Sequence, residues 1–470
     1  MKNIAVIGSG PCGAIAALKL LSLGHQVTML DIGDEYSPNS AYVGNRRGKI
    51  NVKGHESAYD VNEFNKIDDL GKVKNWYSSK VIGGFSHVWG ATWEKQIRII
   101  GSDWDRAYKE VDELVFNSPS TNESKVSFGS ELIVSEVCTC FLQNERSLSL
   151  KFGKENESRI KWQYPNLAIS STRCDFNGGC INHCPNNAIW TALELIEICR
   201  GNQNFHYIGN SFVEKLQLKK ESVGLLINDT LEYFDGCVLS AGPVGNSLLL
   251  LRSRISNQIR LNDTRIGSLA FLRFSKPMFH FGKFSLSGFS ITFRVGKNEE
   301  FDTHLQLYAH TDNFIERLAN KFSVFRSTNL KLLFDKVSPY VVFGLLYLDQ
   351  NCSDKIDLTS GNPPKMSYVG VKKQKSTMIR SYFYLLKNSF SLGLIPIPYI
   401  DFGKPGDSYH LGAGDQDGVL IDDYGFLHQD NRIMISGSFS LPYVLPGSIT
   451  RSSMAQTIRM LNSKKFKHGY

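Results

Sequence analysis

Three glycines near the N-terminus have the spacing of a dinucleotide-binding turn. Gly8, Gly10 and Gly13 form the pattern G-x-G-x-x-G directly after the apolar run IAVI. In this pattern the first glycine permits a tight turn, the second lets a pyrophosphate approach the backbone, and the third lets the helix pack closely on the strand. The pyrophosphate then binds the exposed amides at the helix N-terminus. The sequence therefore predicts a dinucleotide site at these glycines.

The elements that would position this turn surround it in the sequence. Residues 4–7 have the composition of a buried parallel strand, residues 14–24 have helical spacing, and residues 25–31 read as a second strand. Asp31 ends that second strand, about twenty residues after the glycines, where an acidic residue holds the ribose hydroxyls of a dinucleotide. We therefore predict that Asp31 binds ribose.

A second glycine-rich loop, VIGGFSHVWGATWEK, begins at Val81. Gly83 and Gly84 have no Cβ, so the backbone there could approach a flat ring closely. The alternative is a surface turn whose tryptophans lie in the core. Further along, a buried strand runs into Ala241 and Gly242 before a helix. This order favours a backbone packed against a bound nucleotide.

The most unusual stretch is CDFNGGCINHCPNNAIW, which contains Cys174, Cys180 and Cys184. Its spacing, C-x5-C-x3-C-P, equals the ferredoxin run C-x2-C-x2-C-x3-C-P with Asn177 in place of one cysteine. Three thiolates could hold a three-iron cluster, or zinc together with His183. A compact loop with buried thiols is the third interpretation.

Composition limits the classes of function. A chain of 470 residues predicts two or three compact units. The net charge of +8 is spread along the chain without a module of basic and aromatic residues, so we expect no nucleic-acid partner. The longest apolar run, residues 340–348, is too short to span a bilayer. The first predicted strand begins at Asn3, which leaves no room for a signal peptide, so we expect a cytoplasmic protein with reduced cysteines.

The sequence pattern changes in the middle of the chain. In residues 257–399, alternating aromatic and polar residues are typical of antiparallel strands with one solvated face. A helical stretch near residues 312–335 and the apolar run ending at Leu348 interrupt them. We interpret residues 257–399 as an inserted domain that would cover the ring end of the cofactor. Residues 400–470 return to short buried strands and glycine turns, and residues 450–461 have the spacing of a closing helix.

The order of these motifs resembles the glucose–methanol–choline (GMC) oxidoreductases. In that family a C-terminal segment completes an N-terminal FAD fingerprint, with a substrate domain inserted between them. VIGGFSHVWGATWEK looks like the family's GG-S-x-x-W-G loop beside the flavin, and DGCVLSAGPVGNSLLLLRS looks like its VVLAAG segment. The resemblance implies an α/β fold with a Rossmann-like FAD-binding domain of the three-layer β-β-α type. Residues 1–256 and 400–470 would form that domain, and residues 257–399 an α+β substrate domain built on an antiparallel sheet.

The resemblance also implies roles for individual residues. YHLGAG looks like the family's C-terminal His-and-glycine stretch, which makes His410 the catalytic base near flavin N5. Pro446 stands where the family has a second catalytic Asn or His, and Ser448 is the nearest hydroxyl that could help. His87 is either a flavin attachment site or, as we favour, part of the loop packing. The expected FAD contacts are Gly8, Gly10, Gly13, Asp31, Gly83, Gly84, Ser86, Trp89, Gly90, Ala241, Gly242, Gly437 and Ser438.

The activity implied is that of an FAD-dependent dehydrogenase that oxidises the CH–OH group of a sugar or another alcohol. An imidazole with an ordinary pKa of about 6.5 can accept the hydroxyl proton at neutral pH. The three cysteines are similar to those of the gluconate, fructose and glucose dehydrogenase large subunits, in some of which a 3Fe-4S cluster carries electrons from FAD to a cytochrome. The electron acceptor would then be a protein or quinone. The alternatives are a lyase that keeps FAD structurally, and an electron-transfer or binding subunit without alcohol chemistry.

Overall fold

The N-terminal glycine turn connects the central strand of a parallel sheet to the first helix. The five strands are, in spatial order, β20 (Ile433–Ile435), β11 (Gly236–Leu239), β1 (Asn3–Ile7), β2 (Gln26–Leu30) and β7 (Phe205–Ile208). All four neighbouring pairs are parallel, so the carboxyl ends of the strands meet at one edge. Helix α1 (Pro11–Ser22) begins at that edge. The predicted strand–turn–helix is therefore present.

The computed structural model describes most of the chain. The described residues are 1–33, 58–60, 68–69, 77–79, 81–96, 99–116, 160–170, 172–176, 180, 184, 186–274, 286–295, 301–309, 337, 340–390, 393–415 and 417–463. Two sequence predictions, the helix near residues 312–335 and zinc ligation by His183, lie outside these ranges. No helix within them combines the length and apolar character needed to cross a membrane.

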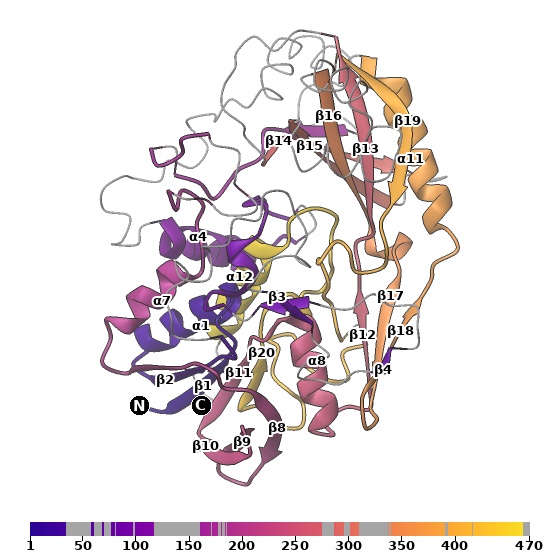
Figure 1. Ribbon diagram of the computed structural model, residues 1–470. Helices are drawn as coiled ribbons and strands as arrows, with labels where there is room; N and C mark the ends of the chain where they lie inside the picture. Colours follow the sequence, from indigo (N-terminus) through magenta and orange to yellow (C-terminus); the bar gives the residue numbers. More distant parts are fainter. Residues whose placement is uncertain are drawn as a thin grey trace.

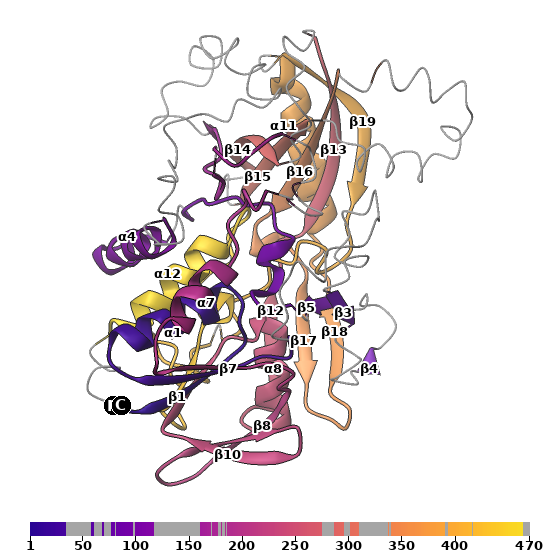
Figure 2. The same cartoon turned by 60° about the vertical axis from the view of Figure 1, so that its left-hand side comes forward.

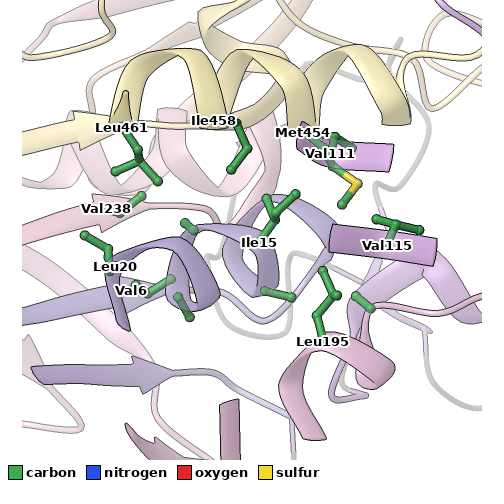
Figure 3. Close-up of a cluster of buried hydrophobic side chains, with 14 of the residues drawn as sticks. Val6, Ile15, Leu20, Val111, Val115, Leu195, Val238, Met454, Ile458 and Leu461 are labelled. Atoms are coloured by element: carbon green, nitrogen blue, oxygen red, sulfur yellow. The ribbon is translucent and has the colours of Figure 1, made fainter. Parts of the chain in front are cut away.

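Strand β1 is apolar throughout because both of its faces are covered. Ile4 and Val6 face a core formed with α1, whereas Ala5 and Ile7 face a second core on the other side of the sheet. Figure 3 shows the first core, where side chains of β1, α1 and the C-terminal helix meet. An uninterrupted apolar run is what such a strand requires, since alternation would place a polar side chain in one core.

The C-terminal segment joins this sheet although it is far away in the sequence. Strand β20 pairs in parallel with β11, and helix α12 (Thr450–Leu461) packs on α1 and α4. Figure 2 shows α12 lying along α1. The other elements of this half are α4 (Ser102–Phe116), α7 (Leu193–Arg200), α8 (Gly242–Arg252), β8 (Val213–Leu218), β9 (Val223–Ile227) and β10 (Thr230–Phe234).

Most of the middle of the chain forms two further sheets, seen on the right of Figure 1. The six-stranded sheet contains, in order, β19 (Leu394–Phe402), β13 (Ile266–Arg273), β16 (Val341–Leu348), β15 (Phe301–Ala309), β14 (Ser287–Val295) and β6 (Ile160–Gln163), and all its pairs are antiparallel. The four-stranded sheet contains β12 (Gln258–Asn262), β17 (Lys355–Thr359), β18 (Lys365–Val369) and β4 (Asp68–Asp69). The short strands β3 (Ala58–Asp60) and β5 (Tyr77–Ser79) pair with each other.

The parallel sheet and the separate antiparallel sheets confirm a mixed α/β fold. Two details of the middle segment differ from the sequence analysis. The apolar run ending at Leu348 does not interrupt the strands, because it is itself β16, a strand buried within the six-stranded sheet. A helix that the sequence analysis did not predict, α11 (Gln374–Ser389), packs on one face of that sheet through Met378 and Leu385.

Candidate active site

The glycine turn is closely packed at two of its three glycines and open at the third. A Cβ on Gly13 would lie 1.9 Å from the carbonyl oxygen of Gly8, and a Cβ on Gly8, whose φ is +102°, would lie 2.5 Å from that of Ser240. A Cβ on Gly10 would meet no atom within 4 Å. Gly10 is the N-cap of α1, and no side chain caps that helix end. Gly10 therefore borders open space at a helix N-terminus, the environment that favours a phosphate group.

Asp31 lies beside this turn and is almost completely buried. Its Oδ2 accepts a hydrogen bond from the amide of Ser9 (2.5 Å), and its Oδ1 accepts one from the amide of Gly33 (2.6 Å). Burial raises the pKa of the Asp31 carboxyl, against the opposing effect of these hydrogen bonds. The structure thus gives Asp31 a role in holding the turn, and ribose binding by its remaining acceptor capacity stays a prediction.

The second glycine-rich loop lies directly against the first. The amide of Gly83 donates to Ser9 Oγ (3.0 Å), and a Cβ on Gly84 would lie 3.1 Å from the Cα of Gly10. Both Gly83 (φ +90°) and Gly84 (φ +62°) have left-handed backbones that favour glycine. The structure therefore brings the two glycine motifs, far apart in the sequence, into contact at one edge of the open space.

Three other residues of this loop have structural contacts. Ser86 Oγ donates to the carbonyl of Gly83 (2.6 Å) and accepts from the amide of Ala192 (2.9 Å). Trp89 Nε1 donates to the carbonyl of Trp190 (3.1 Å), and its ring packs edge-on against that of Trp190. His87 Nε2 hydrogen-bonds with the carbonyl of Ile82 (2.8 Å), a contact within the loop's own packing. The predicted contacts of Ser86, Trp89 and Gly90 with FAD remain predictions.

Two segments from elsewhere in the chain complete the surroundings of the turn. A Cβ on Gly8 would lie 3.0 Å from the Cα of Ala241, so the β11–α8 connection with Gly242 packs against the turn. A Cβ on Gly437 would lie 3.3 Å from Cys12 Sγ, in the first turn of α1. The residues predicted to contact FAD from the C-terminal segment, Gly437 and Ser438, therefore lie beside the predicted pyrophosphate position.

The segment that carries His410 is fixed by hydrogen bonds to the middle of the chain. Asn262, the last residue of β12, exchanges two backbone hydrogen bonds with Gly412 (2.9 and 3.1 Å). The amide of His410 donates to Ser408 Oγ (2.9 Å), which donates to Asp263 Oδ1 (2.7 Å). Burial raises the pKa of Asp263 to about 6. The position of His410 is thus set by a buried network rather than by a free loop.

The segment of His410 also contacts the loop that borders Gly10. The neighbouring Tyr409 packs its ring edge-on against Phe85, with 6.0 Å between the ring centroids. Tyr409 has a φ of +56°, a region that non-glycine residues rarely adopt and that is common at functional sites. Phe85 directly follows Gly84. The His410 segment and the glycine-rich loop therefore meet beside the space that Gly10 leaves open.

The imidazole of His410 is partly buried and uncharged at neutral pH. Its ring stacks on that of Tyr347, with centroids 5.2 Å apart and an angle of 18° between the planes. Its Nδ1 is inaccessible to solvent and has no hydrogen-bond partner within the described residues. Burial, assisted by the nearby His304, lowers the pKa of His410 to about 4. The geometry therefore provides a neutral imidazole that can accept a proton.

The structure adds two residues to this site that the sequence analysis did not single out. His304 and Glu94 are both buried, and His304 Nε2 lies 3.7 Å from Glu94 Oε2. Ser448, the predicted helper of His410, lies near them and donates its hydroxyl proton to the carbonyl of Thr92 (2.6 Å). His304 belongs to the stretch THLQLYAH. The alternation of apolar and polar residues there predicts a strand but does not indicate a catalytic role.

The described residues of the cysteine loop pack as thiols in an apolar environment. Cys180 is buried in a small apolar cluster, and Cys174 and Cys184 pack against it. Burial raises the pKa of Cys174, and the neighbouring Cys180 and Cys184 act in the same direction. Cys184 Sγ accepts a hydrogen bond from the amide of Ala188 (3.3 Å). In the part of the chain that the structure describes, no three His, Cys, Asp or Glu side chains are arranged to hold a metal. The predicted 3Fe-4S cluster therefore finds no support.

FAD, in contrast, fits the residues present. The uncapped N-terminus of α1 at Gly10 and the close approach of Gly84 form a cradle for a pyrophosphate that a Cβ on Gly10 would obstruct. The loop from Gly84 to Phe85 leads from that cradle to Tyr409, the residue before His410. These contacts would extend from the phosphates of the cofactor to its ring end.

Comparisons with known proteins agree with the fold. No family model matches the sequence, and no curated protein matches it either. The chain is similar in structure to pyridoxine 4-oxidase from Mesorbium loti, with a TM-score of 0.61, 14% sequence identity and coverage of 100% of both chains. At this identity the similarity shows that the two proteins share a fold over their whole lengths.

Proposed function

We propose that the protein is an FAD-dependent oxidoreductase of the GMC type that oxidises the CH–OH group of a small alcohol. One observation carries the proposal: His410, whose imidazole is uncharged at neutral pH, belongs to a segment that contacts, through Tyr409, the loop whose Gly84 lies against Gly10. The motif order of the sequence and the fold shared with an enzyme named as an oxidase support the same activity. The proposed substrate class is a sugar or another polar alcohol.

The chain's own residues would bind, orient and deprotonate the alcohol. The helix N-terminus at Gly10 would stabilise the cofactor's negative charge, and Gly83 and Gly84 would let the backbone lie close to the flavin ring. His410 would accept the hydroxyl proton because its ring is uncharged. Tyr347 would keep the imidazole plane fixed by stacking. Bound FAD supplies the acceptor for the hydride that leaves the carbon.

The first prediction concerns the purified protein. We expect an absorption spectrum with flavin bands that are bleached when an alcohol is added without oxygen, because the two electrons of the C–H bond pass to the cofactor. The probes are pyridoxine, benzyl alcohol, glycerol and D-glucose. Reoxidation of the bleached protein by dissolved oxygen and by an added quinone, compared on the same sample, identifies the class of electron acceptor.

Two results would contradict this prediction in different ways. Turnover of an added alcohol that leaves the flavin oxidised and needs no acceptor would identify a lyase. Bleaching by a reduced partner protein but by no alcohol would identify an electron-transfer subunit. About three irons per chain in the same anaerobic sample would leave the bleaching prediction intact and support a cluster at Cys174, Cys180 and Cys184.

The second prediction is the pH dependence of kcat/KM, which reports on the free enzyme. Catalysis needs unprotonated His410, so the rate falls as the pH drops through the pKa of that group. Because burial and His304 lower this pKa to about 4, we expect kcat/KM to stay constant from pH 8 down to about 5. Glu94 and Tyr347 are the other titratable groups facing these two histidines.

A control separates His410 from the carboxyl that supports its segment. Burial raises the pKa of Asp263 to about 6, so its protonation could change the rate in the same range. Kinetic measurements on Asp263→Asn remove that titration. An inflection near pH 6.5 that persists in this variant would contradict the lowered pKa of His410.

A further inference from the structure

The C-terminal turn near His410 offers no side chain to hold the reacting oxygen. Pro446 has no hydrogen-bonding side chain. The hydroxyl of Ser448 already donates its only proton to the carbonyl of Thr92 (2.6 Å). Between them, Gly447 has no side chain at all and a φ of +104°. An oxygen that loses its proton gains negative charge, and a donor placed beside it would stabilise that charge. The donor must come from another element.

The side chain that packs against this turn is His304, from strand β15. A Cβ on Gly447 would lie 3.0 Å from His304 Cδ2 and 3.2 Å from its Nε2. His304 is 3% exposed, and its Nε2 has no hydrogen-bond partner in the part of the chain that the structure describes. We propose that His304 supplies the second hydrogen bond to the reacting hydroxyl, beside His410. This inference rests on the proposed alcohol oxidation.

The neighbours of His304 determine which ring nitrogen carries its proton. Thr292 Oγ1, on the adjacent strand β14, hydrogen-bonds with Nδ1 (2.9 Å). Glu94 Oε2 lies 3.7 Å from Nε2, too far for a direct hydrogen bond but close enough to favour a proton there. A carboxylate can only accept, whereas the Thr292 hydroxyl can donate to Nδ1. The favoured tautomer therefore has its N–H at Nε2.

The arrangement is held rigidly by the six-stranded sheet. Alternate residues of β15 face opposite ways, so Leu305 and Leu307 pack in the core under α11 while His304 faces the other side. On that side His304 is paired with Tyr347 of β16, the residue on which His410 stacks. The Glu94 carboxylate is fixed by Ser290 Oγ, which donates to Oε1 (3.1 Å). Both histidines therefore approach the site from fixed positions around Tyr347.

The proposed step balances without any further reactant. The alcohol O–H proton passes to the ring of His410, and the C–H hydrogen leaves with its electron pair as a hydride to bound FAD. The oxygen that remains becomes the carbonyl oxygen of the product. Throughout, the Nε2–H of His304 donates to that oxygen. Burial lowers the pKa of His304, so this donor is a neutral imidazole and is not consumed in the step.

Two variants of His304 test the position of the donor atom in the FAD-loaded protein. The side-chain nitrogen of glutamine reaches about as far as Nε2, and that of asparagine only as far as Nδ1. We expect His304→Asn to lower the rate of anaerobic flavin reduction about 100-fold and His304→Gln to stay within about tenfold of wild type. Stopped-flow absorbance with the fastest of the four probe alcohols measures both rates. His206→Ala, at an exposed histidine of β7, is the control and should not change the rate.

The outcomes separate this inference from the function on which it rests. A structural role through Thr292 and Nδ1 would preserve the asparagine variant better than the glutamine variant, which overturns the inference. Equal rates in the two variants, fast or slow, with FAD still bound also overturn it, because the position of the nitrogen would then not matter. Wild-type flavin that no probe alcohol reduces overturns the proposed function itself, and this inference with it.

Discussion

The variant His410→Ala should bind FAD normally and fail to be reduced by alcohol. We expect the rate of anaerobic flavin reduction to fall by about 10³-fold, the range for removing a general base. The cofactor should stay bound, because the side chain of His410 contacts Tyr347 and not the turn of Gly8, Gly10 and Gly13. The measurement is stopped-flow absorbance, with the FAD content per chain determined on the same sample.

A matched control variant tests whether the loss of flavin reduction is specific to His410. His428 lies in the same C-terminal segment but is exposed, and its Nε2 contacts the carbonyl of Gly418 (3.1 Å). The change His428→Ala should leave both the rate and the FAD content unaltered. If His410→Ala were reduced within about threefold of the wild-type rate, His410 would not be the base. Loss of FAD in His410→Ala would instead mean that its segment is needed to build the cofactor site.

The second large effect concerns the glycine turn, where neighbouring glycines should respond differently to alanine. We expect Gly13→Ala to destabilise the protein by roughly 3 kcal/mol, because its Cβ would lie 1.9 Å from the carbonyl oxygen of Gly8 and the turn cannot yield without moving β1. Gly10→Ala should leave the stability of the apoprotein unchanged, since its Cβ meets no atom within 4 Å. The free energy of urea unfolding measures both effects.

The same two variants separate folding from cofactor binding. The added methyl group in Gly10→Ala would project into the open space at the N-terminus of α1, so we expect the affinity for FAD to fall at least about tenfold. Quenching of flavin fluorescence gives that affinity. Gly370→Ala, whose Cβ would lie 3.6 Å from Asp354 Oδ1, is the control and should change neither quantity. Unaltered FAD affinity in Gly10→Ala would exclude this turn as the pyrophosphate site.

The parts of the molecule that depend on local physics were predictable from the sequence. The strand at residues 4–7, the glycine turn and the closing helix at residues 450–461 are present as expected. Each has a signal within a few residues: an apolar run for a strand covered on both faces, glycines that no side chain can replace, and apolar spacing for a helix. These signals do not require knowledge of distant contacts.

The middle of the chain was predicted less well because its signals are ambiguous in isolation. The apolar run ending at Leu348 fits a buried strand or a buried helix equally, and only its pairing with β13 and β15 makes it β16. Helix α11 was not predicted because much of its surface is exposed and aromatic, as at Phe383, which weakens its amphipathic pattern. The secondary structure of both segments is therefore determined by their packing in or on the six-stranded sheet.

The sequence by itself determined the glycine turn and singled out His410, whereas the tertiary structure decided what surrounds that histidine. His304, Glu94 and Tyr347 come from a strand, a loop and another strand that are distant in the sequence. No spacing rule connects them, because the register of β15 with β16 and the packing of Gly447 on the sheet alone bring them together. A proton-handling site needs several groups within a few ångströms, and that proximity is a property of the fold.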